Sequence, residues 1–444
     1  MAGQWVRRGL IGVLLTIWSI QVVNACVNPR GDFLLHYEFG RRLQGGEFLY
    51  QGGMHAPYPP AWAVPHAPLS LVPPGVAKPI VHLIGIVSLV ALLAILHDLT
   101  RGSLPLRRNQ HFWVCAATLV ASVWFLLRDY DDGGQNVILM TSVWLGIWLS
   151  MKERPILGGS AIGLAVALKC TAGIFVLYFL LKRQWRFAAS SLACAGLFSL
   201  SPLLWMTPQE FHHTAQSWAE TVTRGISQQD PTVGVIGPEK LQNWSLRNSL
   251  ARYLVHLPPG HPGRAYTDNL PDGHPDRVPH FASVDFLDLE PGTAGFIIKG
   301  LMGLGLLLAV WFMRNSHVGD EGDRLRYLWE LAAVGVIGLL YSPITWGQHC
   351  VAVLPALYLL VRGSAAGKLP DWISRFLIAY ALVFILVSRV TLGKSLGLLV
   401  ESYHLYTFAI VGLLGAMFVT RPGTSAVIVA KPVVTPVQPM QRAA

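Results

Sequence analysis

Long apolar runs recur along almost the whole chain, and they constrain the fold more than any other feature. A helix needs about 20 consecutive apolar residues to cross the hydrocarbon core of a bilayer. Only 13% of the residues are charged, about half the usual share in soluble domains. The sequence therefore excludes a water-soluble fold and predicts an all-α, polytopic integral membrane protein. The runs lie near residues 8–26, 78–97, 112–127, 136–150, 156–168, 170–181, 187–205, 294–313, 327–341, 350–361, 373–388 and 396–419.

Several of these runs are too short to cross a bilayer alone. A helix of about 12 to 16 residues covers only about 18–24 Å, whereas the hydrocarbon core is about 30 Å thick. Such segments need protein neighbours, a re-entrant path or a water-filled cavity to satisfy their backbone polar groups. We therefore expect about 10–12 transmembrane or half-spanning helices, some of them broken, around a cavity that opens on the outer face.

The first run has features of two kinds of segment. Arg7 and Arg8 precede it and Cys26 follows it, as in a cleavable signal or a lipoprotein signal. Because about ten further hydrophobic segments follow, we interpret the run as a retained first span with the arginine pair in the cytoplasm.

Basic residues cluster in the short segments between the runs, and they set the expected orientation, since Lys and Arg are retained on the cytoplasmic side. If residues 156–181 are counted as two passes, every cluster falls on the side of Arg7 and Arg8, so both termini are cytoplasmic. These clusters account for the net charge of +10, which therefore does not indicate nucleic-acid binding. They contain Arg101, Arg107 and Arg108; Lys152 and Arg154; Lys182, Arg183 and Arg186; Arg314, Arg324 and Arg326; Arg362, Lys368 and Arg375; and Arg421 and Lys431.

We expect a single membrane domain over residues 1–419 and a disordered cytoplasmic tail over 420–444. Residues 27–77 form the first outer loop and residues 206–293 a long outer loop. Within the long loop, residues 208–224 carry apolar side chains at helical spacing, which predicts a helix on the outer membrane surface. The Pro- and Gly-rich stretch 257–280 predicts an irregular loop.

Asp32 is the most informative polar residue. It follows the first run, at the expected outer membrane boundary, and precedes a loop rich in aromatic, Gly and Pro residues. A carboxylate in this position could accept a proton from a hydroxyl group that enters from outside. A solvated interfacial acid or a helix cap explains the same residue equally well.

Four short motifs follow in order: D-F-x-x-x-Y from Asp32, G-G-x-x-x-Y from Gly45, Y-P-P from Tyr58, and P-L-x-x-x-P from Pro68. This opening resembles that of glycosyltransferase family 87 (GT87, DUF2029), polyprenyl-phosphate-sugar-dependent enzymes of the GT-C superfamily. Further matches follow as far as residue 355, namely Gly134-Gln135-Asn136, the glycine-rich helix pair with Lys169 between its halves, Asn243-Trp244-Ser245-Leu246-Arg247, and Ser342 to His349.

The resemblance implies a GT-C-like fold and the transfer of a hexose from polyprenyl phosphate to a hydroxyl group on the outer side of the membrane, with inversion of the anomeric centre. Mannose is the hexose that we expect. The resemblance also implies that Asp32 is the general base. Lys169, His349 and Arg247 would bind the phosphate of the sugar donor, although Lys169 could instead snorkel to the interface and His349 could be structural. Acceptor and sugar contacts would come from Tyr37, Tyr58, Gln135, Asn136, Asn243 and Trp346.

The chain departs from the family pattern at three positions. Gly347 and Gln348 stand where the family often has an acid and a histidine, and Trp244 replaces a glutamine. We expect no metal and no other cofactor. A divalent cation at Asp129, Asp131 and Asp132 stays open as an alternative, although a charged, solvent-facing turn accounts for these residues.

The expected partners are a polyprenyl-phosphate-linked sugar, a glycolipid or glycan acceptor, and the lipid bilayer. We expect a multi-pass protein of a bacterial plasma membrane with its active site on the extracytoplasmic side. Two alternatives remain: a transporter or flippase of lipid-linked glycans, which would have charges deep in several spans, and a lipid-linked oligosaccharide ligase, which would depend on its large outer loop.

Overall fold

The computed structural model describes residues 31–51, 57–258, 285–314, 323–387 and 389–423, with isolated positions from 9 to 29 and at 261 and 263. This part of the chain is almost wholly helical, which confirms the all-α class. The helices are α2 (Asp32–Gly45), α3 (Pro74–Thr100), α4 (Arg108–Asp131), α5 (Gln135–Met151), α6 (Pro155–Leu168), α7 (Gly173–Leu181), α8 (Trp185–Ser199), α9 (Pro208–Ser227), α10 (Leu246–Leu254), α11 (Pro291–Met313), α12 (Arg324–Tyr341), α13 (Leu354–Ala365), α14 (Asp371–Leu386), α15 (Arg389–Ser402) and α16 (Leu405–Val419).

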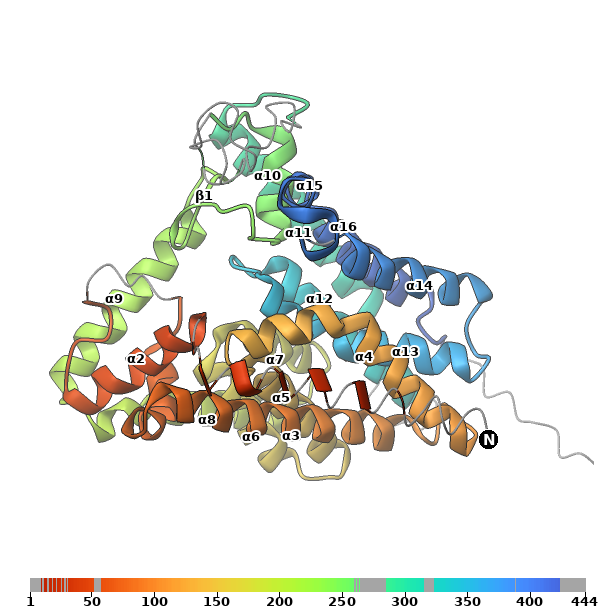
Figure 1. Ribbon diagram of the computed structural model, residues 1–444, viewed down its shortest axis with the longest axis horizontal. Helices are drawn as coiled ribbons and strands as arrows, with labels where there is room; N and C mark the ends of the chain where they lie inside the picture. Colours follow the sequence, from red (N-terminus) through yellow and green to blue (C-terminus); the bar gives the residue numbers. More distant parts are fainter. Residues whose placement is uncertain are drawn as a thin grey trace, which may run out of the picture.

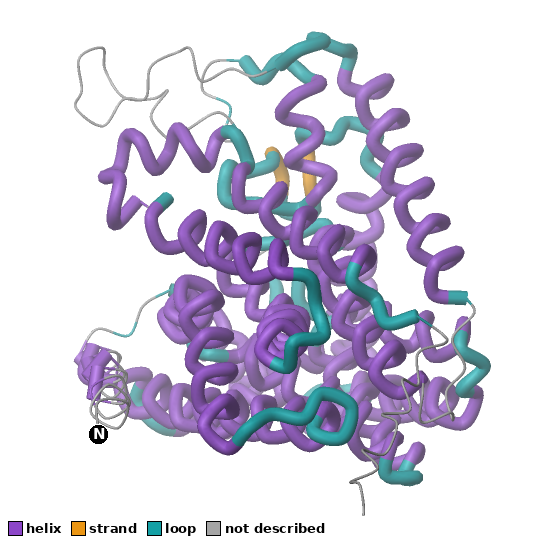
Figure 2. The backbone as a smooth tube through the Cα atoms, turned by 90° about the vertical axis from the view of Figure 1, so that its right-hand side faces the viewer, coloured by secondary structure: helices purple, strands orange, loops and turns teal. Residues whose placement is uncertain are grey.

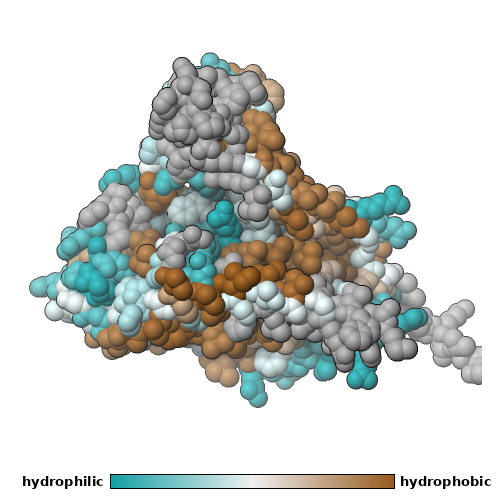
Figure 3. All heavy atoms as spheres, in the orientation of Figure 1, coloured by the Kyte–Doolittle hydropathy of each residue, from teal (hydrophilic) through white to brown (hydrophobic). Residues whose placement is uncertain are grey.

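Within the described ranges, four helical segments are long and apolar enough to cross a bilayer: α3, α4, α11, and α8 with the turn that follows it (Trp185–Leu204). The polytopic prediction is therefore confirmed. These segments bury little of their surface inside the protein; α11, for example, leaves Leu307 68% exposed. Exposed leucines on a long helix suit lipid as the surrounding solvent. Figure 3 shows such apolar side chains over α3, α14 and α16, while hydrophilic side chains gather near α2 and α9.

The predicted broken helix is confirmed at Lys169. α6 ends at Leu168, Lys169 has an extended backbone (φ −149°, ψ 104°), and α7 begins after the short 3₁₀ turn η4 (Cys170–Ala172). The glycines of α6 allow α5 and α8 to approach closely. A Cβ atom at Gly159, for example, would collide with the hydroxyl of Ser190 on α8.

The run near 396–419, expected to be one segment, is bent by 53° between Ser402 and Leu405. The bend has a local cause and a tertiary one. His404 adopts a left-handed conformation (φ 50°), which interrupts the helical hydrogen bonds. Arg252 of α10 then donates a hydrogen bond of 3.1 Å to the carbonyl oxygen of Ser402. A contact from a distant helix thus fixes a bend that hydrophobicity does not reveal.

Helix α12 lies near the centre of the molecule in Figure 1, and the perpendicular view in Figure 2 shows helices through most of the molecule. α12 is buried along nearly its whole length, because α7, α13 and α16 pack around it. Its carboxyl end leads into the loop over residues 342–349 and the 3₁₀ turn η8 (Gly347–Val353), which packs against α4 and α5. This central helix therefore positions the loop that carries His349.

The predicted helix at 208–224 is confirmed as α9, which Thr207 caps by accepting a hydrogen bond from the backbone N–H of Glu210. Beyond it, β1 (Val233–Gly234) and β2 (Gly237–Pro238) form a small antiparallel hairpin, the one sheet in the described part of the chain. The 3₁₀ turns η2 (Pro60–His66), η3 (Pro68–Leu71) and η5 (Ser201–Leu204) complete the described elements. Most of the first run, most of the expected loop 257–280 and the tail from 424 lie outside the described residues.

Candidate active site

Asp32 is the first residue of α2, and two hydrogen bonds position it, one at its carboxylate and one at its backbone N–H. Its Oδ2 atom accepts a hydrogen bond of 2.9 Å from the side-chain amide of Gln348, and its backbone N–H donates to Oδ1 of Asp132 at 3.2 Å. Gly31 makes this approach possible, because its φ is 77° and a Cβ atom there would lie 2.5 Å from the Asp132 carboxylate. The Oδ1 atom of Asp32 accepts no hydrogen bond from any described residue.

The surroundings of Asp32 favour a stronger base than a solvated carboxylate. Burial raises the pKa of Asp32, whereas the hydrogen bond from Gln348 and the positive charges of Lys169 and Lys240 lower it in part. The pKa of Asp132 is raised to about 7, first by burial and then by the negative charge of Asp32. A half-buried carboxylate with one open oxygen can take a proton from a hydroxyl group.

Lys169 lies at the break between α6 and α7, and its ammonium group has an amide and an aromatic ring as neighbours. Its Nζ donates a hydrogen bond of 2.8 Å to Oδ1 of Asn136 and lies 5.8 Å from the centre of the Tyr58 ring. The amide of Asn136 donates in turn to Asp129 at 2.7 Å, and Asp129 also accepts the backbone N–H of Val137 at 3.1 Å. Asp129 thus caps α5 and orients the Asn136 oxygen toward Lys169.

His349 is buried, with one ring nitrogen engaged and the other open. Its Nδ1 lies 3.2 Å from the carbonyl oxygen of Ile344 and 3.3 Å from the backbone nitrogen of Trp346. Either tautomer of His349 has a partner here. A protonated Nδ1 can donate to the Ile344 carbonyl, and an unprotonated Nδ1 can accept from the Trp346 N–H. The Nε2 atom is buried and has no hydrogen-bond partner in the described structure. Such an atom is available to a ligand.

Lys169, Asn136 and His349 line one pocket, which we call the amphipathic pocket. Ser342 adds a hydroxyl group to its polar end. Its other walls are apolar and come from α5, α6, α7, α12 and η8; they include Leu139, Met140, Val143, Ala165, Ala172, Ile174, Phe175, Leu339, Val351 and Ala352. A cation at the end of an apolar pocket suits an anionic group that carries a long hydrocarbon chain.

A second pocket, which we call the tryptophan pocket, is lined by Trp124, Trp244 and Trp346. The rings of Trp124 and Trp244 stack with centroids 5.2 Å apart. Its polar residues are Arg128, Asp132, Lys240, Gln242, Gln348 and Glu401. Asp32 bonds to Asp132 and Gln348 of this pocket and lies within electrostatic reach of Lys169 of the other. We infer that its carboxylate lies between the two.

The departure from the family pattern at Gly347 has a steric reason. Gly347 lines the tryptophan pocket, and a Cβ atom there would lie 2.5 Å from the ring of Trp124. The acid that the family often carries at this position would therefore displace Trp124.

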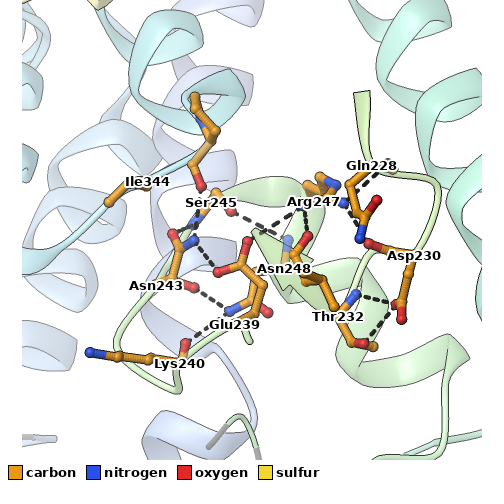
Figure 4. Close-up of polar contacts among 12 residues, drawn as sticks. Gln228, Asp230, Thr232, Glu239, Lys240, Asn243, Ser245, Arg247, Asn248 and Ile344 are labelled. Atoms are coloured by element: carbon orange, nitrogen blue, oxygen red, sulfur yellow. Dashed lines mark hydrogen bonds and ion pairs between the residues drawn. The ribbon is translucent and has the colours of Figure 1, made fainter. Parts of the chain in front are cut away.

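Asn243 and Arg247 lie in a hydrogen-bond network outside both pockets (Figure 4). The amide of Asn243 donates to Glu239 at 2.7 Å and to the Pro343 carbonyl at 2.9 Å, and its oxygen accepts the backbone N–H of Thr345 at 2.9 Å. Arg247 donates to the Asp230 and Val233 carbonyls and faces Glu239 at 3.5 Å. The network therefore joins the segment over residues 230–247 to the loop that carries His349.

Of the remaining predicted residues, Tyr58 and Trp346 contact Lys169 and His349, whereas Tyr37 does not. Tyr58 is buried beneath Lys169 and stacks on Trp62 with centroids 4.6 Å apart, and Trp346 stacks on His349. Gln135 has both side-chain polar atoms buried without a partner in the described structure. Tyr37 instead donates to the Val72 carbonyl at 2.9 Å, which fastens α2 to the loop beside it.

Sequence reasoning did not assign the role of Gln348, although it noted the residue as a departure from the family pattern. The one available signal was its place beside His349, with an amide able to donate to a carboxylate. Among the described residues, the group able to hold a metal ion is His256, Asp285 and Asp288, and the turn at 129–132 is not part of it.

The fold is that of an integral membrane protein, in which the Asp32 carboxylate accepts a hydrogen bond from one pocket and lies within electrostatic reach of a cation of the other. The comparison with known families agrees: glycosyltransferase family 87 matches residues 57–343, so the chain belongs to this family and is a glycosyltransferase. This confirms the family resemblance. The matched range includes Lys169 but neither Asp32 nor His349.

The chain is also similar to individual mycobacterial enzymes. It is 27% identical to a polyprenol-phosphate-mannose-dependent α-(1-2)-phosphatidylinositol mannoside mannosyltransferase of Mycolicibacterium smegmatis, over 78% of this chain and 72% of that protein. It is 25% identical to the pentamannoside mannosyltransferase of the same organism, over 69% of this chain and 61% of that protein. An enzyme of Mycobacterium tuberculosis with the first of these names is 26% identical, over 72% of this chain and 66% of that protein.

Proposed function

We propose that this glycosyltransferase moves mannose from polyprenyl phosphate to a hydroxyl group of a phosphate-bearing glycolipid, with inversion at the anomeric carbon. The observation that carries the proposal is the open Oδ1 atom of Asp32, on a carboxylate with partners in one pocket and a cation in the other. The names of the similar mycobacterial enzymes support the sugar, its carrier and the class of acceptor.

The reaction is a single displacement. The acceptor oxygen attacks C1 of mannose, Asp32 takes the hydroxyl proton, and the bond between C1 and the phosphate oxygen breaks. Polyprenyl phosphate leaves with the electron pair of that bond. Attack opposite the leaving group inverts the configuration at C1. The arrangement supports this path, because Asp32 bonds to residues of the tryptophan pocket, whereas Lys169 and His349 line the amphipathic pocket.

The amphipathic pocket suits the sugar donor. The Lys169 ammonium would neutralise charge that develops on the phosphate as C1 separates from it. With its proton on Nε2, His349 would donate a hydrogen bond to the same group, while its Nδ1 accepts from Trp346. The apolar walls match isoprenoid units. Neither role needs a metal ion, so we propose a metal-independent enzyme.

The tryptophan pocket suits the acceptor. Indole rings present flat apolar faces on which sugar rings can lie. Arg128 and Lys240, both exposed, form no ion pair with any described residue, so they are available to a phosphate group. A glycolipid with a phosphate near its sugars would meet both features.

We propose that the site lies on the outer face of a bacterial plasma membrane. The support is the distribution of basic clusters, which assigns Asp32 and the loop at 342–349 to the side opposite Arg7 and Arg8. A transporter or flippase is not favoured, since the family and the similar curated proteins are transferases.

The decisive experiment reconstitutes the purified protein with polyprenyl-phosphate mannose and a phosphatidylinositol mannoside and measures mannose transfer. Asp32→Asn should reduce kcat by about 10²–10⁴-fold, the usual contribution of a general base. Binding of the sugar donor should persist. Asp371→Asn, at the exposed start of α14, is the matched control and should retain full activity. Undiminished transfer by Asp32→Asn would refute the base assignment.

A further inference from the structure

Three arginines, one in a helix and two just beyond the ends of other helices, line one pocket, which we call the arginine pocket. Arg314 follows α11, Arg326 lies in the first turn of α12, and Arg421 follows α16. None of the described residues that line this pocket is acidic. Its other walls are Trp311, Phe312, Phe418, Pro422 and Gly423.

The arginine pocket and the amphipathic pocket lie at opposite ends of α12. Arg326 is near the amino end of this helix, whereas Leu339 and Ser342, at its carboxyl end, line the amphipathic pocket. α12 has 18 residues, which is about 27 Å of helix, close to the thickness of the hydrocarbon core. On the predicted topology the arginine pocket lies at the other membrane surface, because the basic clusters of the sequence place these residues in the cytoplasm.

Contacts around a buried carboxylate position two of the arginines. Glu330, whose side chain is fully buried, lies 3.4 Å from Arg326, 3.4 Å from Arg421 and 2.7 Å from Lys182. One carboxylate thus contacts three cations. Arg421 also donates to the carbonyl oxygen of Phe312. These contacts fix the guanidinium groups at the pocket before any ligand arrives.

Arg314 differs from the other two. Its guanidinium lies 3.3 Å from the centre of the Trp311 ring, and no described residue accepts a hydrogen bond from it or forms an ion pair with it. A planar guanidinium held on an aromatic face keeps its outward N–H groups free to bind a phosphate with two hydrogen bonds.

We infer that the arginine pocket binds the phosphate headgroup of an anionic phospholipid from the cytoplasmic leaflet. Basic pockets between helices on this side of a membrane suit such headgroups. A lipid fits better than a free phosphate ion because the pocket adjoins α11, whose apolar surface is open to acyl chains. Leu304, Leu307 and Trp311 are exposed by 55, 68 and 57%. This inference does not depend on the proposed reaction.

The test uses the full-length protein in detergent and counts bound lipid by native mass spectrometry. Phosphatidylglycerol should bind and raise the melting temperature, whereas phosphatidylcholine, which has no net charge, should bind weakly. Arg314→Gln should weaken phosphatidylglycerol binding about five-fold, since one basic residue near a membrane contributes about that factor. Arg314→Lys keeps the charge but loses the contact through two hydrogen bonds. It should bind phosphatidylglycerol more tightly than Arg314→Gln and less tightly than the unchanged protein.

Arg375→Gln is the matched control, because Arg375 is an exposed arginine of α14 that lines none of the three pockets. It should bind lipid as the unchanged protein does. Equal binding of phosphatidylcholine, or an equal loss in Arg375→Gln, would overturn the inference. Displacement of phosphatidylglycerol by inorganic phosphate at similar concentration would also overturn it, since the site would then recognise the free anion.

Discussion

Gln348 donates a hydrogen bond of 2.9 Å to the carboxylate of Asp32 from a position 316 residues further along the chain. The bond joins the start of α2 to the loop between α12 and α13. It occupies one carboxylate oxygen and leaves the other for a substrate. Because the same loop carries His349, one segment orients the proposed base and contributes a wall of the amphipathic pocket.

Gln348→Leu tests this relationship through the pH dependence of the reaction. The bond lowers the pKa of Asp32 against the larger effect of burial, so its loss should raise that pKa further. A base must be deprotonated to act. The acidic limb of kcat should therefore lie above the range of an ordinary aspartate in the unchanged enzyme and move to higher pH in the variant.

Gln242→Leu is the control for this variant, because Gln242 lines the same tryptophan pocket and does not bond to Asp32. Its pH profile should stay in place. A limb that moves to lower pH in Gln348→Leu would contradict the proposed role.

Lys169→Ala should affect binding of the sugar donor more than binding of the acceptor. The variant removes the cation at the polar end of the amphipathic pocket. We expect the KM for polyprenyl-phosphate mannose to rise about 10- to 100-fold, as for the loss of a charge-assisted contact of about 1.5–3 kcal/mol. Steady-state kinetics with each substrate varied in turn makes the comparison. A KM change confined to the acceptor would assign Lys169 to the wrong pocket.

The sequence predicted the parts of this site that depend on local pattern. Lys169 stands between two apolar halves of a segment, and a charged residue there favours a helix break beside a cavity. Asp32 follows the first apolar run and precedes a turn-rich loop, which predicts a carboxylate at a membrane boundary. Both features depend only on near neighbours in the chain, so they are visible without a structure.

The contacts of Asn243, Arg247 and Gln348 could not be predicted in this way, because each involves a partner far along the chain or a buried acid. Asn243 bonds to Glu239 and to residues of the loop at 342–349. Nothing in its local motif predicts these contacts. The bend at His404 has the same origin, since Arg252 helps to fix it.

Excess EDTA should leave mannose transfer unchanged if the reaction needs no metal ion. In the proposed reaction, Lys169 and His349 would supply the positive charge and the hydrogen bond that a divalent cation would otherwise provide to the phosphate. The measurement is the initial rate before and after chelation and dialysis. Loss of activity that Mg²⁺ or Mn²⁺ restores would contradict the metal-independent proposal and would direct attention to the carboxylates at 129–132.

Arg247→Met should destabilise the protein without changing the KM of either substrate. Arg247 faces the buried Glu239, and removing one partner of such a pair costs about 3 kcal/mol. Burial raises the pKa of Glu239 to about 7, and the charge of Arg247 lowers it in part. Because the folded-state pKa lies above the ordinary value, stability falls as pH rises through it. Because the charge of Arg247 favours the ionised form of Glu239, the loss in Arg247→Met should be larger at pH 8, where that form prevails, than at pH 6.

Thermal unfolding at the two pH values measures this effect. Arg224→Met, at the exposed end of α9, is the control and should melt as the unchanged protein does. If Arg247→Met kept its stability and raised the KM for polyprenyl-phosphate mannose, Arg247 would be a phosphate ligand, as the family resemblance implies, and the network of Figure 4 would not hold it away from the substrate.

Arg128→Gln should leave the stability of the protein unchanged and raise the KM for the acceptor, in contrast to Arg247→Met. The exposed guanidinium of Arg128 lies 5.2 Å from the centre of the Trp124 ring and forms no ion pair with a described residue, so its removal leaves no buried charge unpaired. The melting temperature should stay within about a degree, since such surface changes cost at most about 0.5 kcal/mol. The KM for a phosphate-bearing acceptor should rise about ten-fold, whereas that for a neutral mannoside should not change. An equal rise for both acceptors would show that Arg128 does not recognise the phosphate.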